Sequence, residues 1–146
     1  MKQDVLITLR GTQSFGADKP ESIELVTRGT MTGRNGKFAV SYEETEMTGI
    51  PGVTTTFLIF NPKRIVLTRE GAIHSRMVFE KDIKNDSLYD LGFGSLMVGI
   101  CAKDIKVDLN ETGGSLLIDY TVDVEQSMTS RNSYEITVKP IKDDIS

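Results

Sequence analysis

Apolar residues recur at every second position over several segments of this chain. The pattern is clear in Val5–Leu9, Phe38–Tyr42 and Leu116–Val124, with polar residues between the apolar ones. Successive side chains of a β-strand point to opposite faces, so each apolar set lies on one face of its strand. Glycine-containing turn segments separate these runs. The pattern predicts an all-β fold, an antiparallel sheet with one dry face that closes, or nearly closes, on itself.

Length and charge narrow the class of protein. A chain of 146 residues is expected to form a single β-barrel domain over residues 1–146. The net charge is -4 at pH 7, and the only local basic cluster is Lys63-Arg64. Nucleic-acid binding needs clustered lysine and arginine, so the sequence argues against a nucleic-acid partner. No segment is apolar enough over its length to predict a membrane partner.

The single cysteine bears on the compartment. Cys101 has no second cysteine with which to form an intrachain disulfide, which is typical of a reducing compartment. The segment Met1–Asp4 leads into a predicted strand without the apolar stretch of a signal peptide. We therefore expect a cytoplasmic protein.

Two hairpins set the expected order of the first strands, which begin at Asp4–Gln13. Asn35-Gly36 predicts a two-residue turn after a strand that starts near Glu21. Counting back from this turn places Met31 opposite Val40, Arg28 opposite Glu43, and Tyr42 over Gly29. The next hairpin is expected to turn through Arg69-Glu70-Gly71, with Gly71 in the left-handed position of a bulge. That turn places Leu67 opposite Ile73 and directs His74 outward, opposite Val66.

The second half of the chain predicts further strands. The segment Lys81–Ser95 is predicted to be a long connection. In the strand that follows, the apolar residues move from even-numbered to odd-numbered positions, which requires a bulge near Cys101–Asp104. A loop at Glu111–Gly114 would place Lys106 opposite Asp119. A last strand, Ser133–Lys139, is expected to pair with the first and close a barrel of about nine strands, with no helix.

Several short motifs resemble the YwiB-like family of bacterial proteins. They are Leu67-Thr68-Arg69-Glu70-Gly71, Met77-Val78-Phe79-Glu80, Tyr89 with Gly94, and Gly113-Gly114 leading to Asp119-Tyr120. The resemblance spans nearly the whole chain. It implies a lipocalin-like (calycin) up-and-down barrel of unknown function and, by analogy, a cavity inside that barrel.

Catalytic and metal chemistry find little support in the sequence. The sole histidine, His74, is expected on the outer face, and Cys101 has no predicted base beside it. Asp104, Asp108, Asp119 and Asp123 share a face with Lys106 among them, which is typical of a solvated surface and not of a metal site. The sequence therefore predicts a protein that is not an enzyme, with no metal and no cofactor.

Polar groups on the inner face suggest a binding site. Tyr42, Tyr120 and Tyr134 carry hydroxyls on apolar faces, Glu44 lies on that face near a strand end, and Arg69 is expected at the barrel rim. An apolar pocket with a few placed polar groups fits a small amphipathic or anionic ligand, held by a monomer or a homodimer. The alternative is a filled barrel whose outer face or edge docks another protein, with Arg69 paired to a rim carboxylate. The candidate ligand-binding residues are Tyr42, Phe57, Ile59, Arg69, Met77 and Tyr120.

Overall fold

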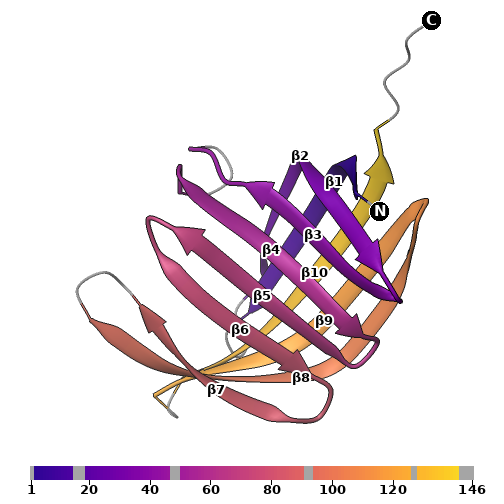
Figure 1. Cartoon of the computed structure of the whole chain (residues 1–146). Helices are drawn as coiled ribbons and strands as arrows, with labels where there is room; N and C mark the ends of the chain where they lie inside the picture. Colours follow the sequence, from indigo (N-terminus) through magenta and orange to yellow (C-terminus); the bar gives the residue numbers. More distant parts are fainter. Residues whose placement is uncertain (1, 15–18, 47–49, 91–93, 126–127, 142–146) are drawn as a thin grey trace, which may run out of the picture.

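The chain folds into one antiparallel sheet. A computed structural model describes residues 2–14, 19–46, 50–90, 94–125 and 128–141. Their order across the 10-stranded sheet is β6-β5-β4-β3-β2-β1-β10-β9-β8-β7 (Figure 1). In chain order the strands are β1 (Lys2–Ser14), β2 (Glu21–Arg34), β3 (Lys37–Glu43), β4 (Val53–Asn61), β5 (Arg64–Gly71), β6 (His74–Glu80), β7 (Lys84–Asp90), β8 (Ser95–Asn110), β9 (Gly113–Val124) and β10 (Met128–Pro140).

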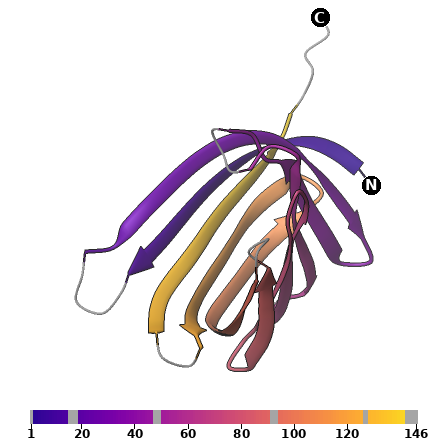
Figure 2. The same cartoon turned by 90° about the vertical axis from the view of Figure 1, so that its left-hand side faces the viewer.

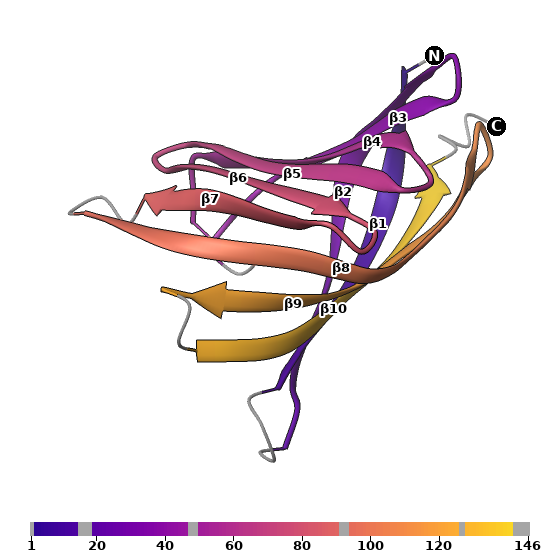
Figure 3. The ribbon, with the colours of Figure 1, turned by 90° about the horizontal axis from the view of Figure 1, so that it is seen from below.

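The sheet curls into a nearly closed barrel. Strands β3 to β6 form one wall and β8 to β10 the facing wall (Figure 3). At the end of the edge strand β6, isolated bridges join Glu80 to Ile83, just before β7, and Lys81 to Ala102 of β8. The all-β architecture expected from the alternation is confirmed. The described part of the chain contains no helix, and so no helix there could cross a membrane.

The first and last strands pair as expected. Ile7 lies opposite Val138 and Leu9 opposite Ile136 in the β1–β10 ladder. Their side chains, with those of the other alternating runs, form one core cluster inside the barrel. Its largest fully buried members are Phe57, Phe79, Ile7, Met31, Ile65, Ile100, Ile118 and Ile136.

The barrel has two different ends. The closed end carries the tight turns that join β2 to β3, β4 to β5 and β8 to β9. The open end carries the connections that join β1 to β2, β3 to β4, β5 to β6, β7 to β8 and β9 to β10. The β1–β2 hairpin reaches beyond the other strands at this end (Figures 2 and 3).

The turn at Asn35-Gly36 is confirmed, but the ladder beyond it is shorter than predicted. Both residues have positive φ, 54° and 77°, as a type I′ turn requires. The β2–β3 ladder stops at Thr30–Ser41, so the expected opposition of Arg28 and Glu43 is wrong. β2 bends here between the two walls (Figure 1).

Gly29 lies at the point where β2 diverges from β3. A Cβ at this position would lie 2.2 Å from the Ser41 carbonyl oxygen and 2.5 Å from Ile7 Cδ1. The ladder ends at Thr30 and Ser41, so the predicted opposition of Tyr42 to Gly29 is wrong. The missing side chain instead lets a neighbouring backbone approach closely, as glycine does where strands bend.

The β5–β6 hairpin turns later than the sequence predicted. Glu70 pairs with His74 and Leu67 with Met77, so the opposition of Leu67 to Ile73 and of Val66 to His74 is wrong. The strand is longer because Gly71, at φ 141°, pairs with Val53 in β4, where a Cβ would lie 1.9 Å from the Gly52 carbonyl oxygen. The shift preserves the inward face of Leu67 and Met77, and His74 is exposed as predicted.

The β7–β9 region holds two further corrections. Lys81–Ser95 contains β7, although Leu91–Phe93 of this segment lie outside the described residues. The bulge in β8 is confirmed, between Ala102 and Asp104. The β8–β9 register differs by two residues, because Gly113 pairs with Asn110 and the loop is only Glu111–Thr112. The Asn110 side-chain oxygen accepts the Thr112 N–H at 2.8 Å and holds this shorter turn.

In that register Lys106 lies opposite Leu117. The predicted opposition of Lys106 to Asp119 is therefore wrong. Because the register differs from the prediction by an even number of residues, every apolar residue stays on the face that was predicted for it.

Candidate functional site

The barrel interior is hollow toward its open end. A cavity of about 210 Å³ lies above the packed core, between the strands of the β3–β5 wall and the inner faces of β1, β2, β6 and β10. Most of its wall is apolar, and its polar groups gather on one side. The lining residues are Leu9, Ile23, Leu25, Tyr42, Glu44, Thr55, Phe57, Leu67, Arg69, Met77 and Tyr134.

A second hollow continues the first toward the rim. It measures about 310 Å³ and shares Ile23, Met77 and Tyr134 with the first cavity. Tyr120 and Asn132 line its floor, and Gly11 to Gln13 and Glu21 to Ile23 line the side of the projecting β1–β2 hairpin. We call the two hollows together the open-end cavity. The interior of a small barrel is either filled by side chains or wide enough for one small ligand.

A buried ion pair forms the polar side of the open-end cavity. Arg69 Nε lies 2.9 Å from Glu44 Oε2 and Arg69 Nη2 lies 2.7 Å from Glu44 Oε1, a bidentate contact. The Thr55 hydroxyl also donates to Glu44 Oε2, and the Ile50 N–H donates to Glu44 Oε1 at 3.0 Å. Glu44 is only 5% exposed. Its carboxylate is therefore fully engaged, as a buried charge must be.

These contacts determine the ionisation of the cluster. Burial alone would raise the pKa of Glu44, but the hydrogen bonds from Arg69, Thr55 and the Ile50 N–H lower it to about 2. The pKa of Tyr42 is raised by burial first and then by the Glu44 carboxylate. At neutral pH the cavity therefore contains a charged but internally compensated pair beside a neutral phenol.

Aromatic rings form the floor between cavity and core. Tyr120 and Tyr134 stack with centroids 5.6 Å apart, and Phe79 meets Tyr120 edge-on at 4.8 Å. Phe57 meets Tyr134 at 5.8 Å in the same T-shaped manner. Such contacts hold the rings in fixed positions. The floor of the cavity is thus preformed.

The structure brings together most of the residues that the sequence singled out. Tyr42, Phe57, Arg69 and Met77 line the deeper hollow, and Tyr120 lines the outer one. Ile59 does not belong with them, because it is buried in β4 near the closed end, beside a separate hollow. Alternation placed Ile59 on the correct face but could not give its height in the barrel.

The ion pair was only partly visible in the sequence. Glu44 was expected on the inner face, but Arg69 was expected in a turn and lies instead within β5, pointing inward. Thr55 was missed, and so was Asn132, which is 8% exposed and donates to the Ser130 hydroxyl at 2.9 Å. Polar residues at inward positions of the alternating runs would have identified both.

Groups that could support metal or nucleophilic chemistry lie apart from the cavity. Within the described ranges, no three His, Cys, Asp or Glu residues are grouped as a metal site requires. His74 is exposed and pairs with Glu70, while Cys101 is half-buried in β8 near the bulge. The acidic face pairs with cations instead: Asp104 with Lys106, Asp119 with Arg131, and Asp123 with Lys84.

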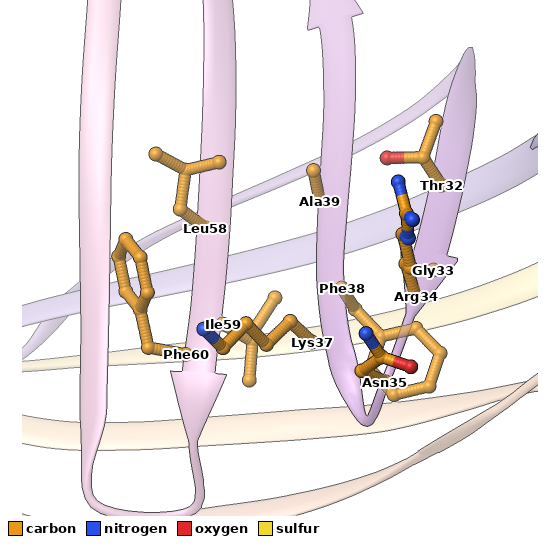
Figure 4. Close-up of a pocket in the computed structure, with 10 residues that line it drawn as sticks. All are labelled: Thr32, Gly33, Arg34, Asn35, Lys37, Phe38, Ala39, Leu58, Ile59 and Phe60. Carbon is orange, nitrogen blue, oxygen red and sulfur yellow. The ribbon is translucent and has the colours of Figure 1, made fainter.

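A different hollow lies on the outside of the β2–β4 wall. It measures about 530 Å³ and is lined by outward-facing Ala39, Leu58 and Phe60, with Arg34 and Lys37 at its margin (Figure 4). Phe60 is partly covered by the Arg64 guanidinium, 5.2 Å from the ring centroid. The charged residues that line this hollow, Arg34 and Lys37, are exposed, which makes it a surface groove and not an enclosed site.

Comparison with known proteins agrees with this fold. Residues 7–136 match the model of a family described as a domain of unknown function, DUF1934. The chain belongs to that family. It is 27% identical over 139 residues to the uncharacterized β-barrel protein YwiB of Bacillus subtilis (strain 168), an alignment that covers 94% of this chain and 95% of YwiB.

A solved structure shares the architecture. The crystal structure of the ywiB protein from Bacillus subtilis aligns with a TM-score of 0.77 and 20% identity over 97% of this chain and 94% of that one. The predicted membership of the YwiB-like family is confirmed, and so is the barrel. The function of the family is unknown.

Proposed function

We propose that this protein binds a small amphipathic molecule in the open-end cavity without transforming it. The observation that carries the proposal is the hollow itself, which lies between a packed core and an open rim. Its deeper part has a mainly apolar wall with one compensated ion pair, Thr55 and two tyrosines, and more polar residues line its rim. Ligand pockets usually combine such walls with a few fixed polar groups. Lipocalin-like barrels use their interior in this way.

The ion pair decides which head group suits the cavity. Glu44 already occupies two of the Arg69 nitrogens, so an anionic ligand would have to displace a buried carboxylate. Breaking a buried pair is costly. We therefore infer that a neutral polar head group is preferred and that its apolar body lies against Leu67, Met77 and the Tyr134 ring.

A pair of methionine variants tests the cavity. Met77→Trp fills the space shared by the two hollows, whereas Met97→Trp makes the same change on the outer face, where Met97 is 41% exposed. Titration of a fluorescent monoacylglycerol analogue should show saturable binding to the wild type and to Met97→Trp. Met77→Trp should bind at least about ten-fold more weakly, a loss near 1.4 kcal/mol. No saturable binding to the wild type, or equal binding to both variants, would overturn the proposal.

A second titration tests the head group. A fluorescent fatty-acid analogue has the same apolar body but an anionic head, and it should bind no more tightly than the neutral probe. If only the fatty-acid analogue bound, Arg69 would have to leave Glu44, and the inferred preference would be wrong. Native mass spectrometry of protein purified from its own host would then identify the retained molecule.

We also propose that the protein works in the cytoplasm. The observation behind this is Cys101, which is unpaired and half-buried. A reducing compartment suits a free thiol in a small β-barrel. Fluorescence imaging of a tagged chain in its host would test the location.

The second candidate function is that of an interaction module. It is favoured by the outer groove over Ala39, Leu58 and Phe60 and by a strand edge on β2 that no other described strand covers. A cavity that stayed empty with every probe, together with a stable protein complex, would favour this alternative.

A further inference from the structure

Half of β2 presents an uncovered edge. β2 pairs with β1 from Glu21 to Thr32 but with β3 only from Thr30 to Arg34. On the side away from β1, no described residue forms a ladder with the segment Glu21–Gly29. Exposed strand edges offer unpaired N–H and C=O groups to another strand, and proteins usually cover them. We call this segment the β2 edge.

The hairpin geometry tells which backbone groups face outward from the β2 edge. Arg34 and Lys37 flank the two-residue turn and form a hydrogen-bonded pair. Hydrogen-bonded pairs recur at every second residue of an antiparallel ladder, so Thr32 and Thr30 follow. Continuing the alternation past the last pair, the N–H and C=O groups of Arg28, Val26 and Glu24 point to the uncovered side.

The side chains of the same three residues lie on the outer face and are exposed. Val26 is 57% exposed, a large value for an apolar residue in a strand. Glu24 and Arg28 are exposed too, and neither forms an ion pair with another described residue. Arg10 lies across from Glu24 in the β1–β2 ladder but makes no ion pair with it. The outward side chains at alternate positions of the β2 edge are therefore acidic at Glu24, apolar at Val26 and basic at Arg28.

We propose that two copies of this chain pair their β2 edges antiparallel, about a two-fold axis at Val26. A two-fold interface must be self-complementary. With Val26 on the axis, Val26 meets its own copy, and each Glu24 lies opposite Arg28 of the second copy. An axis at Glu24 or at Arg28 would instead oppose two like charges, which destabilises a ladder.

The proposed pairing satisfies both the backbone and the side chains of the edge. It forms about six backbone hydrogen bonds, two for each of the hydrogen-bonded pairs. On the inner face, Leu25 lies opposite Thr27 of the second copy. Because Ile23 and Leu25 line the open-end cavity, the second copy closes the wall of the barrel where β2 and β3 diverge. The projection of the β1–β2 hairpin leaves this edge accessible (Figure 3).

Charge exchange tests the interface. Chains with Glu24→Arg carry arginine at both positions, and chains with Arg28→Glu carry glutamate at both. Analytical ultracentrifugation should show a wild-type dimer and, for each variant alone, a dimer dissociation constant at least about ten-fold higher, since two symmetric pairs become repulsive. The double variant Glu24→Arg/Arg28→Glu should recover the wild-type constant.

Mixing the two single variants provides the sharpest readout. The mixed dimer opposes arginine to glutamate at both contacts, so an equal mixture should associate more tightly than either variant alone. Tighter association that appears only on mixing cannot be caused by an effect within a single chain, such as repulsion between Arg10 and the arginine introduced at position 24. Circular dichroism should show that every variant is folded.

A monomeric wild type would overturn the proposal. So would a dimer that both charge variants leave intact, and so would a mixture that stays monomeric. Capture of an unrelated extended peptide by a monomeric wild type would assign the β2 edge to a different partner and would equally overturn it. None of these outcomes depends on whether the cavity binds a ligand.

Discussion

The two ends of the barrel differ in how they use the inward face. In the middle of the barrel, side chains such as Phe79, Ile65 and Ile118 are fully buried and fill the interior, and the hollow at the closed end has a mainly apolar inner lining. Toward the open end the inward positions include Glu44, Arg69 and Asn132, and two hollows remain. A filled barrel maximises stability, whereas inward polar residues cost free energy unless they are paired. The difference indicates that the open end is shaped for something other than stability.

The largest expected effect tests the packed half. Phe79→Ala should lower the free energy of unfolding by about 3–5 kcal/mol, because it leaves a cavity among fully buried neighbours. Met77→Ala, two residues away on the same face, borders an existing hollow and should cost only about 1 kcal/mol. Urea unfolding of both variants measures the difference. Equal losses would show that the two halves are packed alike.

The next effect tests the ion pair at the open end. Glu44→Gln should cost about 2–4 kcal/mol, because Arg69 loses its carboxylate partner in a largely buried setting. Glu43→Gln is the matched control, since the neighbouring side chain is exposed, and it should change stability by less than about 0.5 kcal/mol. A loss in Glu44→Gln no larger than in the control would mean that the pair contributes nothing to the fold.

The same pair predicts a pH dependence. The pKa of Glu44 is about 2 in the folded chain, below its ordinary value of 4.5. The stability that Glu44 contributes is therefore complete above pH 4.5 and is lost as the pH falls from 4.5 toward 2. The difference in unfolding free energy between wild type and Glu44→Gln should narrow over that interval. A constant difference would contradict the assignment of the low pKa.

A smaller effect compares the tight turns of the closed end with the open-end connections. Gly36→Val should cost about 1–2 kcal/mol, because valine must adopt the positive φ of the type I′ turn. No atom lies within 4 Å of the added Cβ at Gly36 or at Gly94, so sterics are matched, but only Gly36 has a positive φ. Gly94→Val should therefore be nearly neutral. Unchanged denaturation midpoints for both variants would exclude the assigned turn.

The smallest effect concerns the outside of the open end. His74 is exposed and lies opposite Glu70, so His74→Ala should change stability by no more than about 0.5 kcal/mol. Thermal unfolding at neutral pH checks this. A loss several times larger would mean that the imidazole packs against other groups, which is incompatible with the outward direction of this side chain.

The alternation of apolar residues by itself determined which side chains face inward. Faces survived even where the register was wrong, as for Val107 and Leu116 in β8 and β9, because both errors were even numbers of residues. The Asn35-Gly36 turn was also determined locally, since few other residue pairs accept two positive φ angles. Family membership followed from short motifs spread along the chain.

Only the tertiary structure determined the position of each residue along the barrel axis and the residues that lie beside it on neighbouring strands. Register depends on which glycines enter a strand, as Gly71 and Gly113 do, and this is settled by the neighbouring strand. The Glu44–Arg69 pair, 25 residues apart in the chain, required β3, β4 and β5 to align. The uncovered β2 edge required β2 and β3 to diverge at Gly29. Local sequence sets the direction of a side chain, but closure of the barrel sets its partners.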